Sequence, residues 1–179
     1  DYELLVAAGA DIDLTEQAAI ISYGAIKALG EEDLPIKFGS SDGSGQGLQV
    51  LQAEQASILY HVTFSNLRNL KKNNWLLTGA VTFLESAVKI AACAFIDNQS
   101  EDALNLVRSR FEMNNCVFRN ASSDAFDSDF CKGTVTNCRF SNSINDGLDL
   151  SGSIITVEDS HFENCGDKGI SAGEASDIT

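Results

Sequence analysis

Aspartate residues that recur at a fixed interval are the side chains of this sequence best placed to do chemistry. Two series recur at steps of 22 residues: Asn105, Asp127, Asp149 and Ser171, and Asp102, Asp124, Asp146 and Lys168. If the repeats stack as strands, Asp127 and Asp149 face each other ~4.8 Å apart, where like charges repel. Such repulsion is relieved by a bound cation, by a shifted pKa or by a neighbouring base.

Calcium is the cation that this pattern favours, because carboxylate oxygens with an asparagine nearby suit Ca²⁺ better than a transition metal. The candidate ligands are Asp124, Asp127, Asp129, Asp146 and Asp149. A structural interpretation stands beside this one, since aspartate at a turn caps backbone N–H groups and outward aspartate keeps a sheet soluble. We favour the structural interpretation for the series that begins at Asp102. For Asp127 and Asp149 we favour function, because aspartate is disfavoured in the middle of a strand.

Composition excludes several classes of protein. The chain has 179 residues, 26 acidic and 12 basic, with a formal net charge of −14, so we expect no nucleic-acid partner. No run of about 18 or more apolar residues is present, so we expect no membrane insertion. The five cysteines form no CxxC or Cys/His metal motif, and their odd number argues against a disulfide framework. Buried free thiols are the expected alternative.

An internal repeat of about 22 residues organises the second half of the chain. Four segments align almost without gaps, beginning at Ala87, Arg110, Lys132 and Ile154. Phe95, Phe118, Phe140 and Phe162 recur at steps of 23, 22 and 22, and Cys93, Cys116 and Cys138 follow the same rhythm. Apolar positions alternate within each repeat, which is the periodicity of strands.

The alternation shifts once in each repeat, at Asn115 and Asn137, where we expect a tight corner because asparagine tolerates left-handed backbone. Three short strands per coil with identical faces stacking predict an all-β parallel β-helix, or β-solenoid. The glycine-rich segment at residues 39–47 lacks the lysine and the following helix of a phosphate-binding loop, so we interpret it as a turn.

The whole chain is expected to be one β-helix domain over residues 1–179. We expect irregular N-terminal coils over residues 1–58, a coil with an enlarged loop at 66–75 over residues 59–86, and four regular coils over residues 87–176. No capping segment is visible after Ser176, and an uncapped solenoid exposes strand edges. We therefore expect a fragment of a larger protein, with further domains of the same chain as partners.

The coil length, the three strands and the asparagine-bearing corner resemble the right-handed parallel β-helix of the pectate-lyase-like superfamily. The xCxFxN and D[AG]LxL sequence patterns are also similar to the repeats of many secreted bacterial proteins. The resemblance implies a substrate groove along the outer face of the strand that holds Asn105, Asp127, Asp129 and Asp149. It also implies an extracellular, cell-surface or periplasmic protein that acts on polysaccharide.

The enlarged loop is the second element that the resemblance brings to this groove. It carries Arg68, Lys71, Lys72 and Trp75, which together with Asn105 are candidate binding residues for an acidic sugar chain. The alternative is a solvated loop whose Trp75 packs on a neighbouring coil. Lyases of this fold use a lysine or arginine as base, and Lys168 and Arg108 are the near candidates here, with a simple ion pair to Asp146 as the alternative for Lys168.

Two functions from different classes follow. The first is a β-helix that binds a polysaccharide and, if it is an enzyme, cleaves it as a polysaccharide lyase or a glycoside hydrolase. The catalytic candidates are then Asp127, Asp149 and Lys168, because carboxylates one or two coils apart match the roughly 5 to 9.5 Å of glycosidases. The second is a non-catalytic stalk or adhesive module. The Gly-His-Gly and Arg-x-Lys signatures of pectin hydrolases are absent, and this favours the second function, whereas the row of aspartates and the enlarged loop favour the first.

Overall fold

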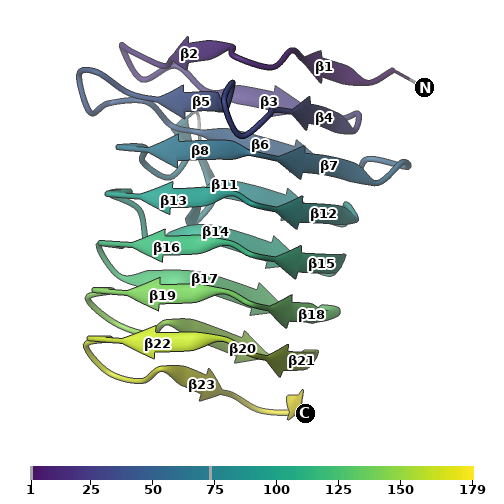
Figure 1. Ribbon diagram of the computed structural model, residues 1–179, viewed down its shortest axis with the longest axis vertical. Helices are drawn as coiled ribbons and strands as arrows, with labels where there is room; N and C mark the ends of the chain where they lie inside the picture. The colour runs from purple at the N-terminus through teal and green to yellow at the C-terminus, as the bar shows by residue number, and fades with distance from the viewer. Residues whose placement is uncertain (1, 73) are drawn as a thin grey trace.

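The computed structural model describes residues 2–72 and 74–179, and within these ranges every regular element is a β-strand. Short strands separated by bends follow one another along the chain, which winds from one end of the molecule to the other (Figure 1). Among the described residues there is no helix of the length and apolarity needed to cross a membrane.

Three parallel sheets form the walls of this coil. Sheet A contains β1 (Leu4–Val6), β4 (Ile26–Leu29), β7 (Ser57–Tyr60), β12 (Val88–Ala91), β15 (Arg110–Asn114), β18 (Lys132–Thr136), β21 (Ile154–Glu158) and β24 (Asp177–Ile178). Sheet B contains β2 (Asp11–Asp13), β5 (Ile36–Gly39), β8 (Val62–Ser65), β13 (Ala94–Ile96), β16 (Val117–Arg119), β19 (Arg139–Ser141) and β22 (His161–Glu163). Sheet C contains β3 (Ile20–Ser22), β6 (Leu48–Leu51), β11 (Gly79–Leu84), β14 (Asp102–Val107), β17 (Asp124–Asp129), β20 (Leu148–Ser151) and β23 (Ile170–Ala172). Each complete coil contributes one strand to each sheet, which confirms the predicted parallel β-helix with three strands per coil.

The register follows the sequence repeat. Phe95 pairs with Phe118, and Phe118 with Phe140, on neighbouring strands of sheet B. Asn105 pairs with Asp127, and Asp127 with Asp149, on sheet C. Because every step of about 22 residues returns the chain to the same position one coil further on, a column in the sequence becomes a row of touching side chains.

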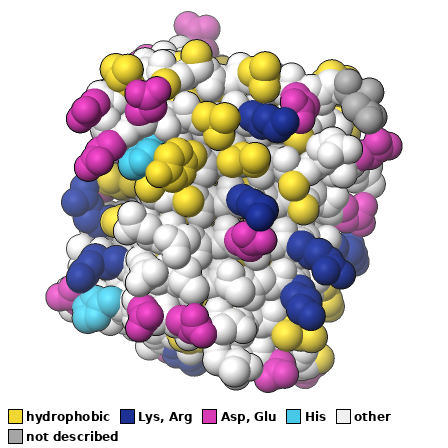
Figure 2. All heavy atoms as spheres, turned by 45° about the vertical axis from the view of Figure 1, so that its right-hand side comes forward, with side chains coloured by type: hydrophobic (Ala, Val, Ile, Leu, Met, Phe, Trp, Pro, Cys, Tyr) yellow, Lys and Arg dark blue, Asp and Glu magenta, His cyan; other side chains and the backbone are white. Residues whose placement is uncertain are grey.

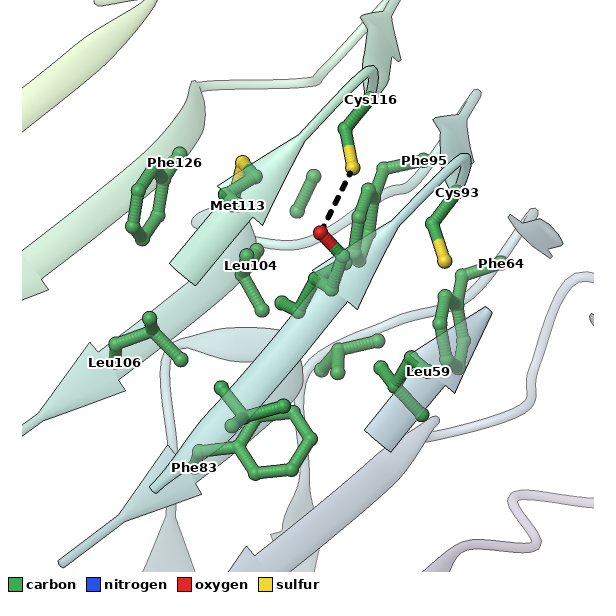
Figure 3. Packing of buried hydrophobic residues seen from close by; sticks show 14 of the residues in the cluster. Leu59, Phe64, Phe83, Cys93, Phe95, Leu104, Leu106, Met113, Cys116 and Phe126 are labelled. Atoms are coloured by element: carbon green, nitrogen blue, oxygen red, sulfur yellow. Dashed lines mark hydrogen bonds between the residues drawn. The ribbon is translucent and has the colours of Figure 1, made fainter. Parts of the chain in front are cut away.

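A stack of phenylalanine rings runs through the interior. The four predicted rings stack with centroids 4.6 to 4.7 Å apart. Phe64 and Phe38 continue the row into the irregular half, each 5.2 Å from the next ring. In the close view of Figure 3, Phe64 lies beside Leu59, and both belong to the same packed core as Phe95, Leu104 and Met113. This apolar interior holds the three sheets at fixed positions, and it therefore fixes what their outer faces present.

Left-handed backbone marks the corners of the coil. Asn115 and Asn137 have φ values of 52° and 53°, as the sequence predicted. A second column of such residues follows sheet B, where Asn164 donates to Asn142 and Asn142 to Asn120 through their side-chain amides, at 3.2 and 3.0 Å. Asparagine adopts this conformation more readily than most residues, and the amide bonds tie each corner to the next coil.

All five cysteines are free, and Cys93, Cys116, Cys131 and Cys138 are buried. The predicted row of inward thiols is therefore confirmed, and Ser160 closes it by accepting a hydrogen bond from the backbone N–H of Cys138 at 3.1 Å. Cys116 also donates to the carbonyl of Ile90, the bond drawn in Figure 3. Cys131 stands in a different column, otherwise made of buried serines, where its N–H donates to Ser153 at 2.9 Å.

The enlarged loop of the sequence is an antiparallel hairpin between sheets B and C. Its strands are β9 (Lys71–Lys72) and β10 (Trp75–Leu76), and Trp75 pairs with Lys72. β8 ends at Ser65 and β11 begins at Gly79, so the hairpin falls within the coil that the sequence predicted to be enlarged.

Candidate functional site on the outer face of sheet C

The outward column of sheet C is polar over most of its length. Gln49, Thr82, Asn105, Asp127, Asp149 and Ser171 occupy paired positions on successive strands. The sequence predicted the last four and missed the first two, because the enlarged loop breaks the repeat before Gly79. Every charged residue within β14, β17 and β20 is an aspartate.

Asp127 lies at the centre of these carboxyls. Its Oδ2 accepts a hydrogen bond of 2.9 Å from Nδ2 of Asn105 on the neighbouring strand. Burial, together with the charges of Asp102, Asp129 and Asp149, raises the pKa of Asp127 to about 8. Asp127 therefore holds a proton at neutral pH, which removes much of the repulsion that the stacked pair with Asp149 would otherwise suffer.

Asp102 is the most deeply placed acid of the cluster, with 2% of its surface exposed. Its Oδ2 is buried without a hydrogen-bond partner among the described residues. Burial is the main reason that the pKa of Asp102 rises to about 7, and the charge of Asp124 adds to it. The sequence assigned Asp102 to a turn, whereas the structure makes it the first residue of β14, paired with Gly79.

The carboxyls of Asp124 and Asp146 accept hydrogen bonds from the backbone of the next coil. Oδ1 of Asp124 accepts from the N–H of Asp146 and from the amide of Asn145, each at 2.7 Å. Oδ1 of Asp146 accepts from the N–H of Lys168 at 2.8 Å. These are the capping bonds of the structural interpretation, and they leave Asp127, Asp129 and Asp149 as the predicted acids on the outer face.

Lys168, the candidate base, lies in the turn that precedes β23. Its ammonium pairs with the adjacent Asp167, and this contact raises the pKa of Lys168 above its ordinary value. A lysine that serves as a general base needs a lowered pKa, so its surroundings act against that role.

The carboxyls have the donor chemistry that Ca²⁺ prefers, but they are not gathered into a ready site. Among the described residues, no group of three or more histidine, cysteine, aspartate or glutamate side chains is arranged to hold a metal ion. Asp129 belongs to the column beside that of Asp127 and Asp149, and burial raises its pKa as well. An ion bound here would keep most of its ligands as water, and this predicts weak binding.

The hairpin residues lie on another part of the same sheet. Lys72 and Trp75 line a hollow with Ile21, Tyr23 and Leu70, beside β3 at one end of sheet C. Nε of Arg68 donates to the carbonyl of Gly43 at 2.6 Å, which fastens the loop to the glycine-rich turn. The structure therefore separates the basic and aromatic residues from the acids that they were expected to flank.

The comparison with protein families agrees with the fold. Residues 108–179 match the family model described as a right handed beta helix region. The chain is a parallel β-helix protein. The match covers three of the four regular coils and includes Asp124, Asp127, Asp129, Asp146 and Asp149. No curated protein and no solved structure matches the chain.

The pattern of charged side chains differs between the face shown in Figure 2 and the strands of sheet C that carry the aspartates. On the face shown in Figure 2, basic and acidic side chains are interspersed, and ion pairs such as Lys89 with Glu112, at 2.9 Å, lie on sheet A. Within β14, β17 and β20, by contrast, the charged side chains are aspartates alone. A row of carboxyls that includes a protonated one can accept hydrogen bonds from hydroxyl groups and can also donate a proton.

Proposed function

We propose that the outer face of β17 and β20 binds a polysaccharide. The observation that carries the proposal is the position of Asp127, whose carboxyl is held by the buried Asn105 at 2.9 Å and shares its face with Asp129 and Asp149. Carboxylates accept hydrogen bonds from sugar hydroxyls, and ionised acceptors make stronger bonds than neutral ones. A β-helix repeats such groups at a fixed step, which suits a polymer that also repeats.

Cleavage of the bound glycan is part of the proposal. The protonated Asp127 is suited to donate a proton to a glycosidic oxygen, as a general acid does. Asp149, paired with it one coil away, supplies the second carboxyl at a spacing of ~5 Å between strands. That spacing lies near the roughly 5–5.5 Å of glycosidases that retain the anomeric configuration.

Calcium is proposed as a weakly bound partner of Asp127, Asp129 and Asp149. It would screen the acids and allow an acidic glycan to approach. Ca²⁺ of millimolar concentration and polysaccharide are both met outside the cell, so we propose an extracellular or cell-surface location, with the periplasm as the alternative.

The proposal is tested by incubating the protein with a panel of neutral and acidic polysaccharides and by measuring both binding and new reducing ends. We expect binding by the parent protein and a loss of at least tenfold in affinity for the variant Asp127→Asn with Asp149→Asn. The variant Asp33→Asn, at an exposed aspartate remote from sheet C, is the matched control. Binding without new reducing ends would reject cleavage, and equal binding by parent and double variant would reject the site.

A rigid stalk is the second candidate, and one observation favours it. The six stacked phenylalanines run through sheet B from Phe38 to Phe162, which makes the coil a continuous packed rod. A protein that binds no member of the glycan panel, with or without Ca²⁺, would support this function.

A further inference from the structure

Gln49 on β6 and Thr82 on β11 are completely buried, although both belong to the outward column of sheet C. The enlarged loop lies over this part of the column, because its residue Leu70 is also completely buried and lines a hollow with Ile21, the strand partner of Gln49. Gln49 and Thr82 are themselves partners on neighbouring strands, which lie ~4.8 Å apart. The two side chains therefore stand next to each other, shielded from solvent.

Each of these two side chains carries a buried oxygen atom without a hydrogen bond. Oε1 of Gln49 and Oγ1 of Thr82 are bonded to no other group among the residues that the structure describes. The hydroxyl is a donor and the amide oxygen an acceptor, so the two could satisfy each other, yet they do not. Burying an unpaired polar group is costly, and such a group in a folded protein calls for an explanation.

The amide nitrogen of Gln49 is turned toward β11, the strand that carries Thr82. Nε2 donates to the carbonyl of Gln46 at 3.1 Å and, at 3.5 Å, to the carbonyls of Gly79 and Ala80. Gly79 also borders the hydroxyl of Thr82, because a Cβ atom at residue 79 would lie 2.7 Å from Oγ1. Glycine at residue 79 therefore leaves the hydroxyl and the amide a common space between the two strands.

A hydroxyl and a carboxamide that are held together can react with each other. We propose that Thr82 and Gln49 form an ester cross-link between β11 and β6. The bond from Oγ1 to Cδ forms and the bond from Cδ to Nε2 breaks. The electron pair of the broken bond leaves with the nitrogen, the hydroxyl proton passes to it, and ammonia departs, so no oxidant, reductant or other reactant is consumed. Fixed geometry favours the step, since it raises the effective concentration of the two groups to as much as ~10⁵–10⁸ M.

Asp102 is the acid that this part of sheet C offers to carry the proton. Its Oδ2 is buried without a partner among the described residues, and Asp102 pairs with Gly79, the glycine that borders the hydroxyl of Thr82. A carboxylate takes the proton of a hydroxyl as general base and returns it to the departing nitrogen as general acid. Burial also excludes water, which protects the ester from hydrolysis once it has formed.

The place of the cross-link in the fold gives it a purpose. The segment from Gln49 to Thr82 contains the enlarged loop, the part of the chain that interrupts the regular repeat. A covalent bond that closes this segment restricts the unfolded chain and so stabilises the pairing of β6 with β11. The cross-link does not depend on the proposed function, because it involves none of the aspartates of β17 and β20.

The mass of the intact chain, measured after denaturation, tests the proposal. We expect the parent protein to be lighter than its sequence requires by one ammonia, about 17 Da, because the threonine hydroxyl displaces the amide nitrogen. Thr82→Val keeps the shape of the side chain without the hydroxyl and should have the full mass, whereas Thr82→Ser should keep the deficit. Thr134→Val, at a threonine of sheet A, is the matched control and should keep the deficit as well.

Peptide analysis separates the ester from other losses of ammonia, such as succinimide formation at asparagine. Proteolysis should give the peptide of Gln49 joined to that of Thr82, and mild alkali should release the two peptides with glutamate at residue 49, because water adds to the ester carbonyl. Asp102→Asn should show little deficit at the time when conversion of the parent is complete. Full conversion of that variant in the same time would remove Asp102 from the proposal. A parent protein of full mass, or a deficit that persists in Thr82→Val, would overturn the cross-link itself.

Discussion

Asn105 and Asp127 are joined between neighbouring strands of sheet C by a hydrogen bond of 2.9 Å from the amide Nδ2 to the carboxyl Oδ2. The bond fixes the side chain of Asp127 on a face that Asp129 and Asp149 share. A carboxyl held in this way beside other carboxyls responds to pH, to cations and to substitution, and each response can be measured.

Stability should fall as the pH rises from about 4 to about 8. Burial and the neighbouring acids Asp102, Asp129, Asp149 and Asp124 raise the pKa of Asp127 in the folded protein from 3.8 to about 8. Between these two pKa values the folded state holds a proton on Asp127 that the unfolded chain has lost. The free energy of unfolding is therefore highest below the pKa of the unfolded chain and falls until the pH reaches the pKa of the folded state. Asp102, whose pKa is raised to about 7, acts in the same direction.

Thermal unfolding across this pH range checks the prediction. We compare the melting temperature of Asp127→Asn with that of the parent at each pH. This difference, variant minus parent, should be at least about 3 °C more positive at pH 9 than at pH 5, after the same difference for the Asp33→Asn control has been subtracted. A difference that does not vary with pH would show that Asp127 is ionised in the folded protein.

Calcium should raise the melting temperature, and more so at high pH. The ion competes with the proton for Asp127, so its affinity is expected to increase as that carboxyl ionises. We expect binding in the range of ~10⁻⁴ to 10⁻³ M, since no dedicated loop wraps the ion. The double variant Asp127→Asn with Asp149→Asn should not respond to Ca²⁺. A parent protein that is equally stable with and without millimolar Ca²⁺ at pH 9 would exclude the calcium site.

Phe118→Ala should destabilise the protein by roughly 3–5 kcal/mol, the usual cost of removing a buried aromatic ring. Phe118 is fully buried and stacks on Phe95 and Phe140 at 4.6 and 4.7 Å. Phe130→Ala is the matched control, because that ring is 62% exposed. Denaturant unfolding should separate the two variants clearly, and equal stabilities would contradict the inward stack.

Cys165 should react with a thiol reagent in the native protein well before Cys93, Cys116 and Cys138. The three buried thiols are at most 2% exposed, whereas Cys165 is partly exposed. Although the thiol of Cys138 acts in the opposite direction, the thiol of Cys93 and burial raise the pKa of Cys116 to about 12, which suppresses the reactive thiolate. Mass spectrometry of the labelled protein gives the order, and early modification of the buried three would show that the row opens to solvent.

The sequence alone was sufficient to predict the coiled fold, because equivalent positions of successive repeats lie next to each other on neighbouring strands. A step of 22 residues places Phe118 beside Phe140 and Asp127 beside Asp149 through strand pairing alone. Asparagine at residues 115 and 137 marks a corner with left-handed backbone, which asparagine adopts more readily than most residues. These features are local or strictly periodic, so a single sequence carries them.

Tertiary structure decided the rest. The sequence did not predict that Phe38 and Phe64 belong to the stack. The steps from 38 to 64 and from 64 to 95 are 26 and 31 residues, which depart from the repeat of about 22. The position of Trp75 beside Tyr23 depends on how the hairpin folds back across the sheet toward an earlier coil. Asp102, which is buried, likewise contacts the end of the enlarged loop, where its backbone N–H donates to the carbonyl of Thr78 at 3.2 Å, and the spacing of aspartates does not reveal this. Periodicity specifies which residues stack, but what covers the outer face comes from segments outside the repeat.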